Sequence, residues 1–311
     1  MLKQAILRFR ILSLLIQTLR KNNRIFFTSA LASRLSWRFR PAFLQSWGSP
    51  GGTLFAGPWI GEFGWELMNW QAFLRHLRPR YERMIVSCPK GNEALYDDFC
   101  DEFVPHDING TSNCHMAFRL RNRSELRRVL ALIPRDADYL QPRRYIPPQH
   151  QAFIRYGHPD ASISRDVLVH ARGKPSSSGR NWSREHWHRL IDSLRRDGLS
   201  VGCIGRKGAT LDLEEASDFR DLPLAKTLDM LASARLVVGP SSGPLHLASL
   251  CGTPHLVWTD RATYSMGMSS REKYESWWNP LKTEVVVMDS DGFNPSPDLV
   301  IAQVRRFFPG P

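Results

Sequence analysis

The chain has 311 residues, which is enough for two α/β domains of about 100–150 residues each. With 42% hydrophobic and 23% charged residues it is a globular protein by composition, and a collagen, a disulfide-rich miniprotein and a fully disordered chain are excluded. No stretch approaches the roughly 20 uninterrupted apolar residues of a membrane-spanning helix, which argues against a multi-span membrane protein.

Most of the net charge lies near the N-terminus. Forty-two Lys and Arg against thirty Asp and Glu give a net charge of +12, and residues 1–50 contain nine of the basic residues and no acidic one. Because the rest of the chain is nearly balanced, we expect no basic groove across the whole protein and no nucleic-acid partner.

Residues 5–19, AILRFRILSLLIQTL, place Arg8 and Arg10 among apolar residues. This pattern predicts that residues 1–48 form a basic amphipathic leader that lies on an anionic membrane surface. The alternatives are a packing helix and a signal peptide cleaved near residues 30–32. The five cysteines are odd in number and include no C-x-x-C pair, as expected of free thiols in a reducing cytoplasm. We therefore expect a cytoplasmic protein, peripheral at the inner membrane if the leader binds lipid.

Residues 49–150 are predicted to form one domain. A strand is expected over 53–58, followed by a Gly-rich turn, a helix over 65–77 and a second strand over 83–89. These elements make one βαβ unit. A further helix is predicted over 124–133, and the prolines and glycine of 141–160 indicate a linker.

Residues 151–311 repeat this alternation more clearly. Strands are expected over 166–172, 199–205, 235–240 and 253–260, and helices over 183–198, 224–234, 241–252 and 296–308. Ser183 and Thr227 are the predicted caps of the first two helices. Alternating strands and helices predict an α/β fold with two Rossmann-like, doubly wound domains facing a cleft. Such domains bind ligands at the carboxyl ends of their strands.

The strongest chemical signal is VGPSSGPLHLA at residues 238–248. A buried strand ends in Gly-Pro, and Pro244 stands where a helix would begin. Free backbone N–H groups and the helix dipole suit a phosphate or diphosphate there, with Ser241 and Ser242 as hydroxyl donors. Gly243 allows close backbone approach. The absence of G-x-G-x-x-G and of a P-loop lysine motif argues against a dinucleotide oxidoreductase and a P-loop NTPase.

Residues 239–258, GPSSGPLHLASLCGTPHLVW, resemble the C-terminal signature of the heptosyltransferase-like bacterial glycosyltransferases, glycosyltransferase family nine. VLVHARG followed by RNWSREHWHRL resembles that family's earlier strand and helix start, so that the resemblance covers residues 166–260. It implies a GT-B fold whose C-terminal half holds a nucleotide-sugar donor. It also implies that His246 lies beside the donor diphosphate as a catalytic residue; a core histidine is the alternative. Ser241 stands where the family often has Asp.

Basic residues follow two of the predicted strands. Arg172, Lys174 and Arg180 come after His170, at and beyond the end of the strand predicted over 166–172. We expect them to neutralise the diphosphate and stabilise the leaving group without metal. Gly205 and Arg206 follow the next strand, in a loop expected near the nucleoside. The alternatives are a solvated basic loop and a plain exposed turn.

The turn GEFGWE at residues 61–66 is expected to supply the general base. Gly61 and Gly64 free the backbone for a substrate, and an acid at this carboxyl strand end would face the cleft. Inverting transfer needs a base to take the proton of the acceptor hydroxyl. We assign this role to Glu62. Glu66, within the helix, is a candidate substrate contact, or alternatively a partner of the helix dipole.

No metal and no other cofactor is expected. The ten histidines include no H-x-x-x-H pair, and residues 289–291 are interpreted as a loop. The expected function is inverting, metal-independent transfer of a sugar from a nucleotide-diphospho-sugar to a glycan or lipid-linked saccharide. The alternatives are an epimerase-like nucleotide-sugar enzyme of the same fold and a non-enzymatic binder of membrane surface or nucleic acid.

Overall fold

The computed structural model describes residues 51–113, 116–120, 122–142, 146–261, 264–265 and 267–309. These residues form two compact units, between which the chain passes more than once. One unit holds residues 51–62, 79–89 and 101–142, and the other holds 63–78, 90–100 and 146–309. The sequence analysis instead expected two contiguous domains, 49–150 and 151–311. The basic leader, with its predicted amphipathic helix, lies outside the described residues.

The first unit is built on a parallel sheet with the strand order β3-β2-β1-β6. The elements of this unit are β1 (Thr53–Ala56), β2 (Arg83–Val86), β3 (Glu102–Phe103), β4 (Gly110–Asn113), β5 (Met116–Leu120), α6 (Arg123–Ala131) and β6 (Asp138–Leu140). The apolar runs predicted as strands form the centre of the sheet. Leu126 and Val129 of α6 pack with Phe55 and Ile85 of the central strands. Helix α6 therefore covers one face of this sheet.

The second unit contains a six-stranded parallel sheet with the order β14-β11-β10-β7-β8-β9. Its strands are β7 (Val167–Val169), β8 (Val201–Gly205), β9 (Ser217–Arg220), β10 (Leu236–Pro240), β11 (His255–Trp258) and β14 (Val285–Met288). Numbered along the chain and read from β9, this is the order 3-2-1-4-5-6 of a Rossmann sheet. The predicted parallel, doubly wound arrangement is confirmed for this unit.

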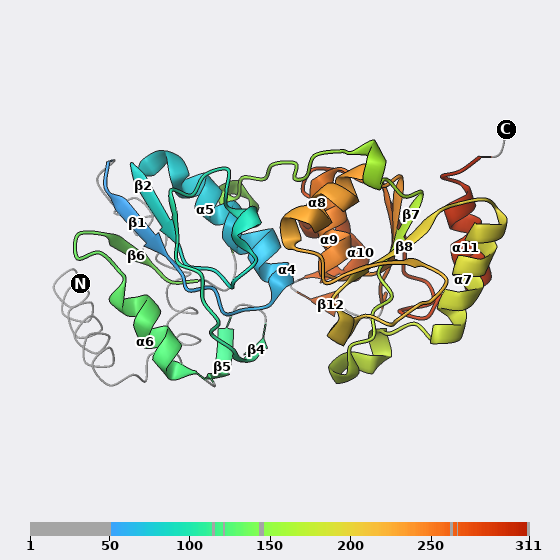
Figure 1. The fold of residues 1–311 in the computed structure, drawn as a ribbon, viewed down its shortest axis with the longest axis horizontal. Helices are drawn as coiled ribbons and strands as arrows, with labels where there is room; N and C mark the ends of the chain where they lie inside the picture. Colours follow the sequence, from blue (N-terminus) through green and yellow to red (C-terminus); the bar gives the residue numbers. More distant parts are fainter. Residues whose placement is uncertain are drawn as a thin grey trace. The chain divides into compact units, whose positions relative to one another are not determined.

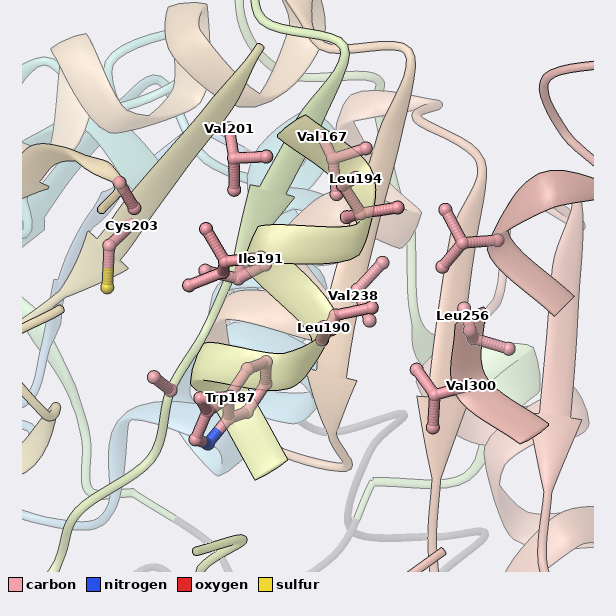
Figure 2. Close-up of a cluster of buried hydrophobic side chains, with 14 of the residues drawn as sticks. Val167, Trp187, Leu190, Ile191, Leu194, Val201, Cys203, Val238, Leu256 and Val300 are labelled. Carbon is pink, nitrogen blue, oxygen red and sulfur yellow. The ribbon is translucent and has the colours of Figure 1, made fainter. Parts of the chain in front are cut away.

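Helices α7 (Arg184–Arg196) and α11 (Pro297–Arg305) lie side by side on one face of the second sheet (Figure 1). Trp187 and Leu190 of α7 and Val300 of α11 pack with Val167 and Val238 of the strands (Figure 2). Burial of this apolar surface stabilises the unit. Trp187 is completely buried in this cluster, as expected of a packing residue.

Helix α9 (Gly243–Cys251) covers the opposite face, beside α8 (Leu224–Ser233). Side chains alternate along a strand, so Val238 points toward α7 and the neighbouring Gly239 points the other way. A Cβ atom at Gly239 would lie only 3.0 Å from Leu245 of α9. Because both faces are covered, the central strands read as continuous apolar runs.

The helix caps were predicted with mixed success. Ser183 caps α7, since its Oγ accepts a hydrogen bond from the His186 N–H at 3.1 Å. Thr227 as a cap is wrong. Helix α8 begins after Pro223, and Thr227 lies inside the first turn, where its hydroxyl donates to the Pro223 carbonyl at 3.2 Å. A threonine bonded to the preceding turn lies in a helix interior.

Several short elements were not predicted. The expected helix over 65–77 consists of α4 (Phe63–Trp65), the π-helical turn η2 (Glu66–Trp70) and α5 (Gln71–Leu77). Near the C-terminus lie β12 (Tyr264–Ser265), β13 (Met268–Ser269), α10 (Ser270–Lys273) and the π-helical turn η9 (Tyr274–Trp278). Among the described residues, no helix combines the length and apolar character needed to cross a bilayer.

Candidate functional site

The second sheet reverses its strand order between β7 and β10. These two strands pair with each other, while β8 lies beyond β7 and β11 lies beyond β10. In open α/β sheets, ligands bind outside the carboxyl ends of the strands at this switch point. His170 and Arg172 follow β7, and Ser241 and Ser242 follow β10. The topology therefore brings two of the predicted loops to the same end of the sheet.

Helix α9 begins directly after β10. Ser242 is its N-cap, but its side chain makes no capping hydrogen bond, and its buried Oγ has no partner among the described residues. An N-cap serine normally accepts a hydrogen bond from an N–H group of the first turn. Because no side chain caps this end of α9, the positive end of the helix dipole favours an anion there. Pro244, in the first turn as predicted, has no N–H to satisfy.

His246 lies one turn into α9 and is only 7% exposed. Burial, with contributions from the nearby charges of Arg180, His255 and Lys273, lowers the pKa of His246 to about 3, so that the ring is neutral at pH 7. Its ring stacks on Trp278 with centroids 4.6 Å apart. Its Nδ1 is buried and has no hydrogen-bond partner in the described part of the chain. His246 can therefore offer a ligand a hydrogen bond but no charge.

Two guanidinium groups lie in the same region. Burial, and after it the charge of Arg180, lower the pKa of Arg172, which is 6% exposed. Arg180 donates a hydrogen bond to the Ser241 carbonyl, and its guanidinium lies 4.8 Å from the centre of the Phe293 ring. Arg172 donates to the Asn181 side chain. An anion between the two guanidinium groups would relieve their mutual repulsion.

Gly205 is required by the backbone. Its φ is +129°, and a Cβ atom there would lie 2.3 Å from Thr210 Oγ1 and 2.9 Å from His170 Nδ1. Burial lowers the pKa of His170 to about 4. Sequence reasoning did not select His170, although its place directly after β7 marks it as a switch-point residue. The predicted substrate contact of Gly205 stays a prediction.

Other predicted site residues lie around this region without a contact that tests them. Lys174 and Arg206 are exposed. Gly243 is the first residue of α9, and a Cβ atom there would lie 3.0 Å from Phe63 Cδ1. A Cβ atom at Gly64 would lie 3.6 Å from Nδ1 of His246, so the short helix α4 passes beside the imidazole. Gly61 and Glu62 belong to the first unit.

Gly61 is half-buried and Glu62 is exposed, directly before α4. The exposure of the Glu62 carboxyl agrees with a group that meets a substrate, but it agrees equally with a surface turn. The roles of both residues stay predictions.

Glu66 opens the π-helical turn η2 and is 1% exposed. Its Oε1 accepts a hydrogen bond from Tyr96 Oη at 2.6 Å, and its Oε2 accepts one from Asn92 Nδ2 at 2.7 Å. Burial raises the pKa of Glu66 to about 8, and these hydrogen bonds and the charge of Arg206 offset only part of that rise. The pairing of Glu66 with the helix dipole stays an alternative. A substrate contact of Glu66 stays a prediction.

We expect the Glu66→Gln variant to lose part of the pH dependence of stability. Since folding raises the pKa from 4.5 to about 8, the folded state holds a proton that the unfolded state releases between these values. The corresponding stability is fully present below pH 4.5 and is lost as the pH rises through about 8, at up to about 1.4 kcal/mol per pH unit. Urea unfolding of both proteins across this range measures the slope. Parallel slopes would show that Glu66 ionises like an exposed carboxyl.

Sequence reasoning missed the helical segment that brings Trp278 against His246. Ser269 and Glu272 form a capping box at the start of this segment, in α10, and their S-x-x-E spacing is the signal that could have predicted it. The helical segment continues through η9 to Trp278. Lys273 Nζ lies 5.6 Å from the centre of the Trp278 ring and 5.9 Å from that of Trp65. This lysine adds a third cation near the start of α9.

No group of three or more His, Cys, Asp and Glu side chains in the described ranges is arranged to hold a metal ion. Two Asp-x-Asp sequences occur, at 136–138 and 289–291. Asp138 accepts a hydrogen bond from Tyr81 at 3.1 Å, and Asp289 forms an ion pair with Arg271 at 2.9 Å. These carboxylates are engaged within the protein. That no metal takes part in the function stays a prediction.

Comparison with solved structures finds glycosyltransferases. The family 9 glycosyl transferase from Veillonella parvula matches over 82% of this chain and 96% of its own, with a TM-score of 0.54 and 12% identity. ADP-heptose LPS heptosyltransferase II from E. coli matches over 82% of this chain and 98% of its own, with a TM-score of 0.48 and 13% identity. No model of a protein family matches the chain, and neither does any curated protein in a sequence comparison.

The chain thus has the α/β fold of the Veillonella family 9 glycosyl transferase, and it resembles the heptosyltransferase-like proteins in fold as well as in its residues 166–260. At this low identity the likeness concerns the fold. Because one fold hosts many functions, the function has to be argued from the site itself.

Proposed function

We propose that this chain is a glycosyltransferase whose donor is a nucleotide-diphospho-sugar. The observation that carries the proposal is the set of anion-binding groups at the switch point of the second sheet. One region holds the guanidinium groups of Arg172 and Arg180 and the start of α9. It also holds Ser242 Oγ and His246 Nδ1, which have no hydrogen-bond partner among the described residues. A diphosphate has the negative charge and the several acceptor oxygens that these groups can bind.

The same groups support a chemical role. Transfer breaks the bond between the anomeric carbon of the sugar and the phosphate oxygen, so negative charge builds up on the departing diphosphate. Fixed guanidinium groups and a helix start stabilise such charge without reorganising during the reaction. Since Arg172 and Arg180 are the protein's own cations, metal-independent transfer is part of this proposal.

The remaining parts of the proposal come from the sequence. Glu62 is the general base that takes the proton of the acceptor hydroxyl, which gives an inverting displacement. The acceptor is a glycan or a lipid-linked saccharide. We also propose that the chain has the cleft of a GT-B fold. The leader, residues 1–48, attaches to an anionic membrane surface at the cytoplasmic side.

A thermal-shift panel tests the donor site. We expect one of UDP, GDP, ADP, dTDP and CMP to raise the unfolding temperature in the presence of EDTA. A ligand at a hundred times its dissociation constant adds about 2.7 kcal/mol of stability, which is a shift of several degrees. The nucleotide that produces the shift identifies the base of the donor. If none of the five shifts the transition, before or after magnesium is added, the proposal loses its main support.

A further inference from the structure

A pocket of about 260 Å³ lies in the second unit, beside the residues that surround His246. Residues from three parts of the chain line it, among them Asn69 of η2, Gln151 and Phe153 of the segment before β7, and Trp277 and Trp278 of η9. None of its lining residues is an Asp, Glu, Lys, Arg or His. The pocket therefore suits a ligand without charge.

The aromatic wall of the pocket is held in place. Ser249 Oγ of α9 donates a hydrogen bond to the Trp278 carbonyl at 2.7 Å. The Trp65 ring packs edge-on against the Trp278 ring, with centroids 5.5 Å apart. Trp277 and Phe153 are half-buried and add further apolar surface. Rigid aromatic walls that need no ordering on binding favour a ligand with flat apolar faces.

Two side-chain amides give the pocket polar groups of known orientation. Asn69 is 4% exposed, and its Oδ1 accepts hydrogen bonds from the Ile146 N–H at 3.1 Å and from Gln151 Nε2 at 3.3 Å. Gln151 Nε2 also donates to the Ile146 carbonyl at 2.8 Å. Hydrogen bonds to the Ile146 backbone fix the orientation of both amides. Asn69 Nδ2 and Gln151 Oε1 are therefore the amide atoms that can bond to a ligand. Neither atom has a hydrogen-bond partner among the described residues.

We propose that this pocket binds a neutral saccharide ring, as the acceptor subsite of the proposed glycosyltransferase, on whose function the inference rests. A pyranose has apolar C–H faces for the tryptophan and phenylalanine rings, and hydroxyls that can both donate to Gln151 Oε1 and accept from Asn69 Nδ2. An acceptor must also lie close to the donor. Trp278 lines the pocket and stacks at 4.6 Å on His246 of the candidate diphosphate site, so one side chain separates the two.

Saturation-transfer NMR on the full chain tests the pocket. The probes are the methyl glycosides of neutral hexoses and of N-acetylhexosamines, each with and without the nucleotide that stabilises the protein. We expect at least one glycoside to give a signal that is about tenfold weaker or more in Trp277→Ala and in Gln151→Ala. Trp277→Phe should recover part of it, and the signal should be unchanged in Leu299→Ala, which alters an exposed side chain on α11.

The thermal shift by the nucleotide, measured on the same variants, separates this inference from the proposed donor site. A preserved shift in Trp277→Ala and Gln151→Ala shows that both variants are folded. If the nucleotide binds and no glycoside gives a signal, or if the signal is equal in all variants, the acceptor pocket is refuted while the donor site stands. If a glycoside signal depends on Trp277 but no nucleotide binds, the pocket stands and the proposed transferase function fails.

Discussion

Replacing Glu62 by glutamine is expected to slow sugar transfer by about 10²–10⁴-fold, the usual contribution of a general base. Glutamine keeps the size of the side chain but cannot take the proton that the acceptor hydroxyl loses as it attacks. Binding of the donor nucleotide should be unchanged, because the base acts on the acceptor. The measurement is the initial rate of nucleoside diphosphate release, together with the thermal shift by the nucleotide.

Glu284→Gln is the matched control, since Glu284 is also an exposed glutamate, next to β14 and away from the candidate site residues. It should retain full turnover. If Glu62→Gln also retains near-normal turnover, Glu62 is not the base. Glu66, whose pKa is raised, would then be the next carboxyl to test as the base. Its hydrogen bonds from Tyr96 and Asn92 would have to break before it could take a proton from the acceptor.

Replacing Arg180 by alanine is expected to weaken binding of the donor nucleotide by about 10–100-fold, because hydrogen bonds to charged groups contribute about 1.5–3 kcal/mol. The thermal shift at a nucleotide concentration that stabilises the original protein should then largely disappear. Arg180→Lys should recover only part of the thermal shift, since an ammonium group lacks the planar, bidentate hydrogen-bonding geometry of a guanidinium. Titration of the shift with nucleotide concentration gives the affinity of each variant.

Arg189→Ala is the control for this substitution. Arg189 is exposed on α7 and pairs with Asp298, so its loss removes one positive charge from the same unit away from the switch point. Its nucleotide affinity should be that of the original protein. Because Arg180 also contacts the Ser241 carbonyl and Phe293, the unfolding temperature without ligand shows whether the variant is intact. An unchanged affinity in an intact Arg180→Ala protein would place the diphosphate elsewhere.

Much of the second unit could be predicted from the sequence because its signals are local. The runs at 166–172, 199–205 and 235–240 are apolar, since their strands are buried on both faces. Caps such as Ser183 act within one turn, and the Gly-Pro-Ser-Ser-Gly-Pro segment marks a strand end followed by a helix start. Strand β9 was missed because SDFR is polar and lies at the edge of the sheet, where burial does not select apolar residues.

The sequence by itself determined the alternation of strands and helices in the second unit and the loops after β7 and β10 that hold Arg172 and Ser242. Only the tertiary structure decided the raised pKa of Glu66 and the lowered pKa of His246, the stacking of His246 on Trp278, and the pocket at Asn69 and Gln151. The physical reason is that the pKa of a side chain depends on its burial and on partners far away in the chain. The same factors decide which polar atoms stay without a hydrogen-bond partner. Asn69 and Gln151 are 82 residues apart, and no local pattern predicts that their amides meet.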